Sequence, residues 1–301
     1  MIIKMLNFKR TFFLVLLLLA GIAANAQRER FNAAYKFLQD GQLDSAKVNI
    51  NMVVLHPETA ADGQSWYLRG FIYKSIYNKN EKTNKQSSAR LEALISFKKS
   101  MQLDTSAENT QENVKNIKYL ATTLYNDAGA SLDSVDYKIA IKNFETFKEY
   151  YLLVDPTPAN IKQREIDFTM AIASLYTRTF ESDRKGKYEF MKLAKDAYSK
   201  ILADDPNNIS ANYNMGILYY NQAVNLINQS DYDLDIVALN DIQDNSITLF
   251  KESLPFMEKA YDLDPKRRET LLGLSGIYFS LNEFEKSNMY KQKLEEIEKQ
   301  K

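Results

Sequence analysis

The sequence predicts an all-α protein, a right-handed α-solenoid of about six antiparallel helix pairs, and three observations lead to this prediction. Runs of aliphatic and aromatic residues end repeatedly at Asp-Pro or a close equivalent, as in KAYDLDP, which ends at Pro265. The distances between these stops are similar along the chain. Before each stop, apolar and small residues are spaced three and four positions apart, which places them on one face of a helix.

The stops recur with a period of about 50 residues. Proline lacks an N–H group and pushes the preceding residue out of the α region, so Asp-Pro after an amphipathic run is a helix stop. Self-similarity at such a period indicates a stacked repeat array. The stops are Pro57, Thr105 (in LDT, in place of LDP), Pro156, Pro206 and Pro265.

The first 26 residues have a different composition and are typical of a secretory signal peptide. Three basic residues precede FFLVLLLLA, and the segment ends in Ala24-Asn25-Ala26. A basic start, a short apolar run and a small-x-small site predict cleavage before Gln27. The alternative is a membrane anchor, but the apolar run is shorter than the roughly 20 residues that a spanning helix needs. We therefore expect residues 27–301 to form the mature helical domain.

Charge and cysteine content exclude several functions. Loss of Lys4, Lys9 and Arg10 with the signal peptide leaves a net charge near −3, which gives no general attraction to nucleic acid or anionic lipid. The chain has no cysteine, so disulfides, thiolate metal sites and a lipid-modified N-terminal cysteine are excluded. We expect a periplasmic protein that is not a lipoprotein and has no integral membrane segment after cleavage.

The same helix pattern is found before several stops. Ala194, Tyr198 and Ile201 precede Pro206 by 12, 8 and 5 residues. Equivalent trios precede the other stops at the same offsets, and we expect all of these residues to be buried. These trios are Ser253, Met257 and Ala260 before Pro265, and Ala93, Phe97 and Ser100 before Thr105. The expected helix pairs span residues 29–57, 62–104, 111–155, 160–205, 209–264 and 267–299. In the third pair, the second helix runs four residues longer than the pattern.

A second pattern follows the stops and resembles the tetratricopeptide repeat. Trp66, Gly70 and Tyr73 in SWYLRGFIY have the spacing of that family's W-x2-L-G-x2-Y motif, and Gly216 and Tyr219 repeat part of it. The last pair keeps the family spacing without a gap. The resemblance implies a solenoid in which each pair buries its apolar face on the next one. Most pairs depart from the family's 34 residues, and they do so between their two helices, where polar insertions lie at Tyr77–Ala89, Thr179–Lys187 and Ser230–Asn245.

Residues that could carry chemistry are few, so we predict no enzyme activity, no metal site and no cofactor. The only histidine, His56, cannot build a common zinc site without cysteine or a second histidine. The sequence around Ser275 does not match a nucleophile elbow. Asp231, Asp233 and Asp235 resemble the start of a calcium loop, but Ile236 and Ile242 occupy the positions of the required glycine and glutamate. We interpret that stretch as a solvated acidic loop.

The resemblance implies a concave groove lined by the first helix of each pair. Aromatic side chains there are plausible anchors for a peptide because they offer a large contact area with few rotatable bonds. The alternative is that several of them only fill space in the superhelix. The predicted groove residues are Phe31, Tyr35, Tyr67, Phe71, Tyr213, Ile217, Tyr220, Leu272 and Phe279.

These observations favour a non-enzymatic scaffold of the cell envelope that binds a peptide segment or partner protein through its concave face. Family members that clamp a C-terminal carboxylate use Lys and Asn where this chain has Tyr67 and Phe71, or Tyr213 and Ile217, so that specialised role is disfavoured. The first alternative is an outer-membrane-associated protein that binds glycans or nutrients. The second is a hydrolase hidden in the insertions, none of which is long enough to form a catalytic domain. The sequence does not indicate the oligomeric state.

Overall fold

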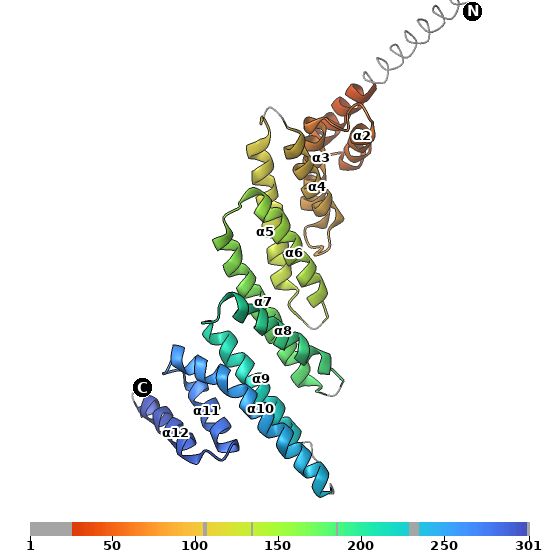
Figure 1. The fold of residues 1–301 in the computed structure, drawn as a ribbon. Coiled ribbons are helices and arrows are strands. Elements are labelled where there is room, and N and C mark those ends of the chain that lie inside the picture. The colour runs from red at the N-terminus through yellow and green to blue at the C-terminus, as the bar shows by residue number, and fades with distance from the viewer. Residues whose placement is uncertain (1–25, 105–106, 134, 185, 229–234, 300–301) are drawn as a thin grey trace, which may run out of the picture. The chain divides into compact units, whose positions relative to one another are not determined.

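The computed structural model describes residues 26–104, 107–133, 135–184, 186–228 and 235–299, which form helices and connecting turns without any β-strand (Figure 1). The all-α prediction is therefore confirmed for this part of the chain. No helix within it is both long and apolar enough to cross a membrane. The predicted signal peptide lies outside the described residues, apart from Ala26.

The helices pair in sequence order, as predicted. Helix α3 packs on α4, α9 on α10 and α11 on α12, while α2 also contacts α3 and α10 also contacts α11. The first described helical segment covers residues 26–39. It is followed by α2 (Leu43–Leu55), α3 (Gly63–Ile76), the π-helix η1 (Tyr77–Glu81), α4 (Ser88–Leu103), α5 (Thr110–Ala130), α6 (Tyr137–Val154), α7 (Pro158–Ser182), α8 (Tyr188–Asp204), α9 (Ile209–Asn228), α10 (Ile236–Leu263), α11 (Arg268–Ser280) and α12 (Phe284–Lys299).

The chain divides into two compact units. Unit 1 comprises residues up to Ser131 together with Lys138–Pro158, and unit 2 comprises Leu132–Tyr137 together with Ala159–Lys301. Tyr137 belongs to unit 2 because its ring packs edge-on against Tyr176 and Phe190, with centroids 5.6 and 5.8 Å away. The right-handed stacking of successive pairs stays a prediction.

The Asp-Pro stops end helices in the way the sequence predicts. Asp205 and Asp264 precede prolines, and both leave the helical region, with ψ of 84° and 86°. Asp104 ends α4 in the same way, although a threonine follows it. The carboxylates of Asp205 and Asp264 each accept the backbone N–H two residues later, at 3.2 Å. Aspartate therefore precedes the proline because it begins the turn into the next helix.

The predicted buried stripe is confirmed. The trios expected before Pro206, Pro265 and Thr105 are all fully or almost fully buried. In α6 the buried residues include Ala140, Phe144 and Phe147, which have the same spacing shifted four residues toward the N-terminus. The extra turn of that helix therefore lies beyond the repeat pattern.

Small residues allow the helices to approach closely. A Cβ atom on Gly70 would lie 2.6 Å from the ring of Phe97 on α4. Met257 on α10 occupies the equivalent place in the fifth pair, since a Cβ on Gly216 would lie 2.6 Å from its Cγ. The Met257 side chain also lies where a side chain on Gly273 would have to be, so it packs between α9 and α11. A glycine of the first helix thus contacts a large side chain of the second helix in two different pairs. This agrees with the tetratricopeptide resemblance of the individual helix pairs.

The insertions contain more helix than their polar composition predicts. After Tyr77 the chain continues as η1, and Tyr77 is buried beneath the Arg90 guanidinium, 5.2 Å from its ring centroid. Helix α7 continues to Ser182, because Phe180 is buried and packs against Tyr188.

The third insertion is partly a helix and not only the solvated loop that we expected. Helix α10 begins at Ile236, and the Asp235 carboxylate caps it by accepting the Ala238 N–H at 2.8 Å. Asp235 therefore acts as a helix cap. Asp231 and Asp233 lie outside the described residues.

Candidate functional site

Four of the predicted groove residues meet in one hollow in unit 1, which we call the N-terminal hollow. It has a volume of about 410 Å³ and lies between residues 26–39 and α3. The predicted Phe31, Tyr35, Tyr67 and Phe71 all line it, and the sequence reasoning missed the other four residues. Those are Asn32, Leu38, Gln64 and Leu68.

The aromatic side chains that line the N-terminal hollow pack against a buried phenylalanine of α4. Tyr67 and Phe71 pack edge to face with ring centroids 5.0 Å apart. Both also contact Phe97, whose ring is fully buried, at 6.3 and 5.7 Å. Because Gly70 lets Phe97 approach the backbone of α3, the packing fixes the two rings before any ligand arrives. Tyr35, by contrast, is 50% exposed and forms the open rim.

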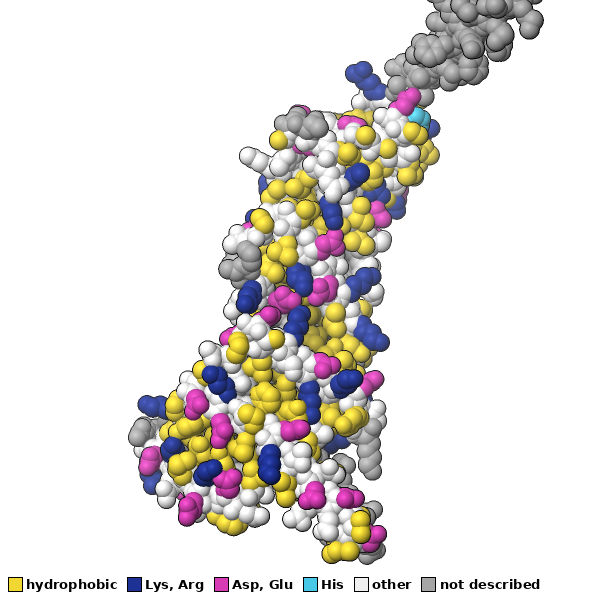
Figure 2. Space-filling model, viewed as in Figure 1, with side chains coloured by type: hydrophobic (Ala, Val, Ile, Leu, Met, Phe, Trp, Pro, Cys, Tyr) yellow, Lys and Arg dark blue, Asp and Glu magenta, His cyan; other side chains and the backbone are white. Residues whose placement is uncertain are grey.

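The other five predicted residues meet in a second hollow in unit 2, the C-terminal hollow, of about 570 Å³. Tyr213, Ile217 and Tyr220 come from α9, and Leu272 and Phe279 from α11. Figure 2 shows hydrophobic side chains gathered over α9 and α11, with charged side chains among them. The remaining lining residues are Glu269, Gly273, Ser275, Gly276, Ser280 and, from α12, Lys291.

The α9 side of the C-terminal hollow is anchored and the α11 side is exposed. Tyr213, Ile217 and Tyr220 are partly buried against the core formed by α9 to α12. Leu272 and Phe279 are 62% and 56% exposed. The α9 residues therefore also fill space in the stack, whereas Leu272 and Phe279 bury less than half of their surface within the chain.

Basic side chains cover several of these rings. The Arg267 guanidinium lies 4.2 Å from the ring centroid of Tyr213, and the Lys291 ammonium lies 5.5 Å from that of Phe279. In unit 1, the Lys74 ammonium lies 5.1 Å from the ring centroid of Phe71. The sequence reasoning missed Lys74, although its position one helical turn after Phe71 was the available signal.

The hydroxyls of Tyr67 and Tyr213 keep their protons well above neutral pH. Burial raises the pKa of Tyr67, and the nearby Glu112 carboxylate adds to the effect. Burial also raises the pKa of Tyr213, although Arg267 opposes the shift. Both hydroxyls are therefore neutral hydrogen-bond donors that can bind polar groups of a ligand.

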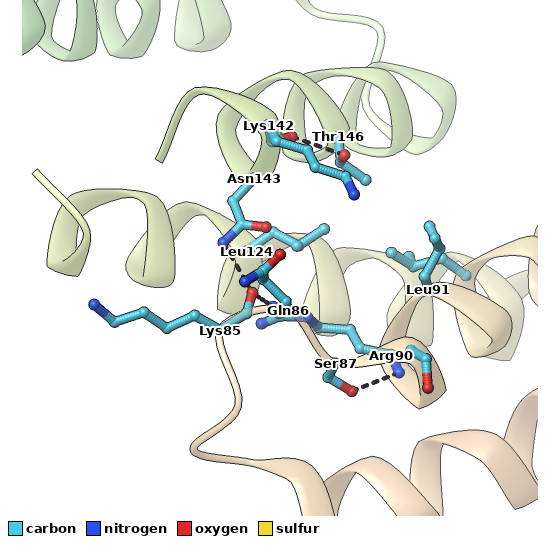
Figure 3. A pocket seen from close by; sticks show the side chains of 11 residues that line it. Lys85, Gln86, Ser87, Arg90, Leu91, Leu124, Lys142, Asn143 and Thr146 are labelled. Atoms are coloured by element: carbon cyan, nitrogen blue, oxygen red, sulfur yellow. Dashed lines mark hydrogen bonds between the residues drawn. The ribbon is translucent and has the colours of Figure 1, made fainter. Parts of the chain in front are cut away.

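A third hollow, of about 220 Å³, lies in unit 1 between α4, α5 and α6 (Figure 3). Its polar groups are largely occupied by one another. The Lys85 carbonyl accepts hydrogen bonds from Arg90 and Asn143, and the N-terminus of α4 is capped by Ser87 and by the Glu81 carboxylate. We therefore do not assign a binding role to this hollow.

The described residues contain no cluster of three or more histidine, aspartate or glutamate side chains that could hold a metal ion. His56 ends α2, where its Nδ1 atom accepts the backbone N–H of Glu58 at 3.4 Å. Ser275 is almost fully buried on α11.

No protein-family model matches the chain, and no curated protein matches its sequence. The solved structures with which the chain aligns include three of different proteins. The structure of a human IFIT1 dimer with m7Gppp-AAAA has 13% sequence identity to this chain and a TM-score of 0.34. The alignment covers 88% of this chain but only 59% of the IFIT1 chain. MamA is 17% identical with a TM-score of 0.32, covering 77% of this chain and 92% of MamA. A tetratricopeptide repeat protein from Parabacteroides merdae is 15% identical with a TM-score of 0.26, covering 91% and 93%. At such scores, we assign neither a family nor a function from these similarities.

Proposed function

We propose that the chain is a non-enzymatic scaffold that binds extended segments of a partner protein, and that the N-terminal and C-terminal hollows are each a binding site for such a segment. One observation carries the proposal. The nine groove residues that the tetratricopeptide resemblance implies all line two hollows, and exposed hydrophobic surface remains at each rim, from Tyr35 in one and from Leu272 and Phe279 in the other. Hollows of this size and character match hydrophobic side chains of a partner, with tyrosine hydroxyls and basic groups available for its backbone.

The proposed site of action is the periplasm. Residues 1–26 have the composition of a cleaved signal peptide, and the absence of cysteine excludes lipid attachment at the new N-terminus. A scaffold there would act on other exported proteins. Binding of glycans is the second candidate, because aromatic rings such as Tyr35 and Phe279 also form platforms for sugar rings.

The test is to immobilise residues 27–301 and identify the proteins captured from envelope extract, with a glycan array in parallel. For the partner found, Tyr67→Ala or Tyr213→Ala should weaken binding about thirtyfold, because truncating an anchor typically costs about 2 kcal/mol. Tyr188→Ala is the matched control, since Tyr188 is exposed on α8 and lines neither hollow. Glycan binding without protein capture, or normal binding by both groove variants, would contradict the proposal.

A further inference from the structure

We propose that each hollow recognises a hydrophobic side chain of the partner together with a neighbouring side-chain carboxylate. Lys74 would bind the carboxylate at the N-terminal hollow and Lys291 would bind it at the C-terminal hollow. This inference rests on the proposed function and adds the chemical class of the bound segment, which is hydrophobic and acidic.

The ammonium of Lys74 contacts a neutral amide and two aromatic rings. Its ammonium donates a hydrogen bond to the Asn116 side-chain oxygen at 2.5 Å and lies over the rings of Phe71 and Tyr119, at 5.1 and 5.5 Å from their centroids. Tyr119 is itself fixed by donating to the Asn78 side-chain oxygen at 2.8 Å. Among the described residues, no carboxylate forms an ion pair with Lys74.

Glu112 is the acidic residue whose charge acts on Lys74: it partly offsets the lowering of the Lys74 pKa by burial, but it forms no ion pair with that ammonium. It lies 3.6 Å from the ammonium of Lys115, its neighbour on α5. Lys74 is partly buried, and this burial lowers its pKa because the ammonium has lost part of its hydration. An ammonium has three donors, and the interaction with Asn116 uses one. Lys74 can therefore bind a carboxylate supplied by another molecule.

The position of Lys74 links charge recognition to the hydrophobic hollow. Phe71 is both a wall of the N-terminal hollow and the ring beneath Lys74. In an extended segment, residues two positions apart point to the same side and lie about 7 Å from each other. A hydrophobic residue in the hollow would thus place an acidic residue two positions away close to Lys74.

The C-terminal hollow repeats this arrangement. Lys291 lines the hollow beside Phe279, with its ammonium 5.5 Å from the ring centroid, and no carboxylate of the described residues pairs with it. Glu269, the acidic residue of the same hollow, lies 3.7 Å from the Arg267 guanidinium. Each hollow therefore has a lysine over one of its aromatic rings: Lys291 lines the C-terminal hollow, and Lys74 lies over Phe71 beside the N-terminal hollow. We assign both hollows the same ligand chemistry for this reason.

The experiment is a selection from a displayed library of random twelve-residue peptides against residues 27–301. Four proteins are compared: wild type, the double variant Lys74→Gln/Lys291→Gln, the charge-retaining variant Lys74→Arg/Lys291→Arg, and Lys47→Gln. Lys47 is the matched control, because its ammonium also lies over a tyrosine ring, that of Tyr73 at 5.6 Å, but outside both hollows. Circular dichroism checks that each variant remains helical.

We expect the wild type to select peptides with an aromatic or large aliphatic residue near Asp or Glu. The Gln double variant should keep the hydrophobic preference and lose the acidic one, whereas the Arg and Lys47 variants should keep both. For one selected peptide, replacing its Glu by Gln should weaken wild-type binding about tenfold and leave binding to the Gln double variant almost unchanged.

The outcomes separate this inference from the proposed function. Hydrophobic peptides selected without acidic residues, or an acidic preference that survives in the Gln double variant, would overturn the roles of Lys74 and Lys291 and leave the scaffold function intact. If no enriched peptide binds more weakly to Tyr67→Ala or Tyr213→Ala than to the wild type, both this inference and the proposed function are overturned.

Discussion

Arg90 is the most completely buried charged side chain described in the chain, at 1% exposure, and its surroundings explain why η1 forms. Its guanidinium donates to the Asp127 carboxylate at 2.6 Å and to the Lys85 carbonyl at 2.8 Å, and it lies over the ring of Tyr77. A buried charge needs such partners, because desolvation would otherwise cost several kcal/mol. The residues that lengthen the second helix pair therefore surround this ion pair.

Removing the negative charge of Asp127 should lower the stability of the helices around Arg90. In Asp127→Asn the guanidinium keeps a hydrogen-bond acceptor but loses its counter-charge, so we expect a loss of roughly 3 kcal/mol in the free energy of opening around α4 and α5. Hydrogen exchange of the amides in these helices measures the loss. The matched control is Glu149→Gln, which breaks the exposed pair with Lys98 and should cost below about 1 kcal/mol. Equal losses in the two variants would contradict this account.

At the scale of the element, the contact between a small residue and a large side chain positions the N-terminal hollow. Gly70 faces Phe97, and Phe97 in turn supports Tyr67 and Phe71. A methyl group on Gly70 would force Phe97 to move, and rings of this size shift only at a cost in the packed core.

Gly70→Ala should therefore lower stability by about 1–3 kcal/mol and also weaken ligand binding in the N-terminal hollow. Gly129→Ala is the control, because a Cβ at this helical glycine of α5 would meet no atom within 4 Å. Alanine favours a helix over glycine by about 1 kcal/mol, so Gly129→Ala should be neutral or stabilising. Thermal unfolding followed by circular dichroism compares the two. A melting temperature that rises in both variants would show that Phe97 does not restrict position 70.

The helices also show which features of the fold and of the two hollows could be predicted from the sequence. Helix ends and the buried stripe were predictable because proline stops and three- and four-residue spacing act locally. Nine of the residues that line the two hollows were predictable, because the tetratricopeptide resemblance aligns the first helix of each pair and position along a helix fixes the face on which a residue lies. The extension of helix into the insertions was not, because it depends on contacts between distant residues, such as that of Arg90 with Asp127. The polar composition of those insertions alone indicated loops. Lys74 was missed for a similar reason, since its role depends on Asn116 and Tyr119 of the next pair.

At the scale of the whole molecule, stability should be a sum of neighbouring contacts. Within each of the two compact units, the described contacts between helix pairs join neighbours in the chain, such as α2 with α3 and α4 with α5 in unit 1 and α10 with α11 in unit 2. In such arrays a destabilising substitution first lowers the stability of its own helix pair and of the adjacent pairs, because distant pairs share no contacts with it. The two hollows, one in each unit, should therefore respond separately to mutation.

Met257→Ala tests this expectation. Met257 is fully buried and packs against Gly216 and Gly273, so its truncation should leave a cavity that costs about 2–5 kcal/mol. Hydrogen exchange should accelerate in α9, α10 and α11, while the amides of α3 and α4 keep their wild-type protection. Peptide binding that depends on Tyr213 should weaken, whereas binding that depends on Tyr67 should be unchanged. Equal loss of protection in both units would instead show that the chain unfolds as one cooperative body, and the nearest-neighbour account would then be wrong.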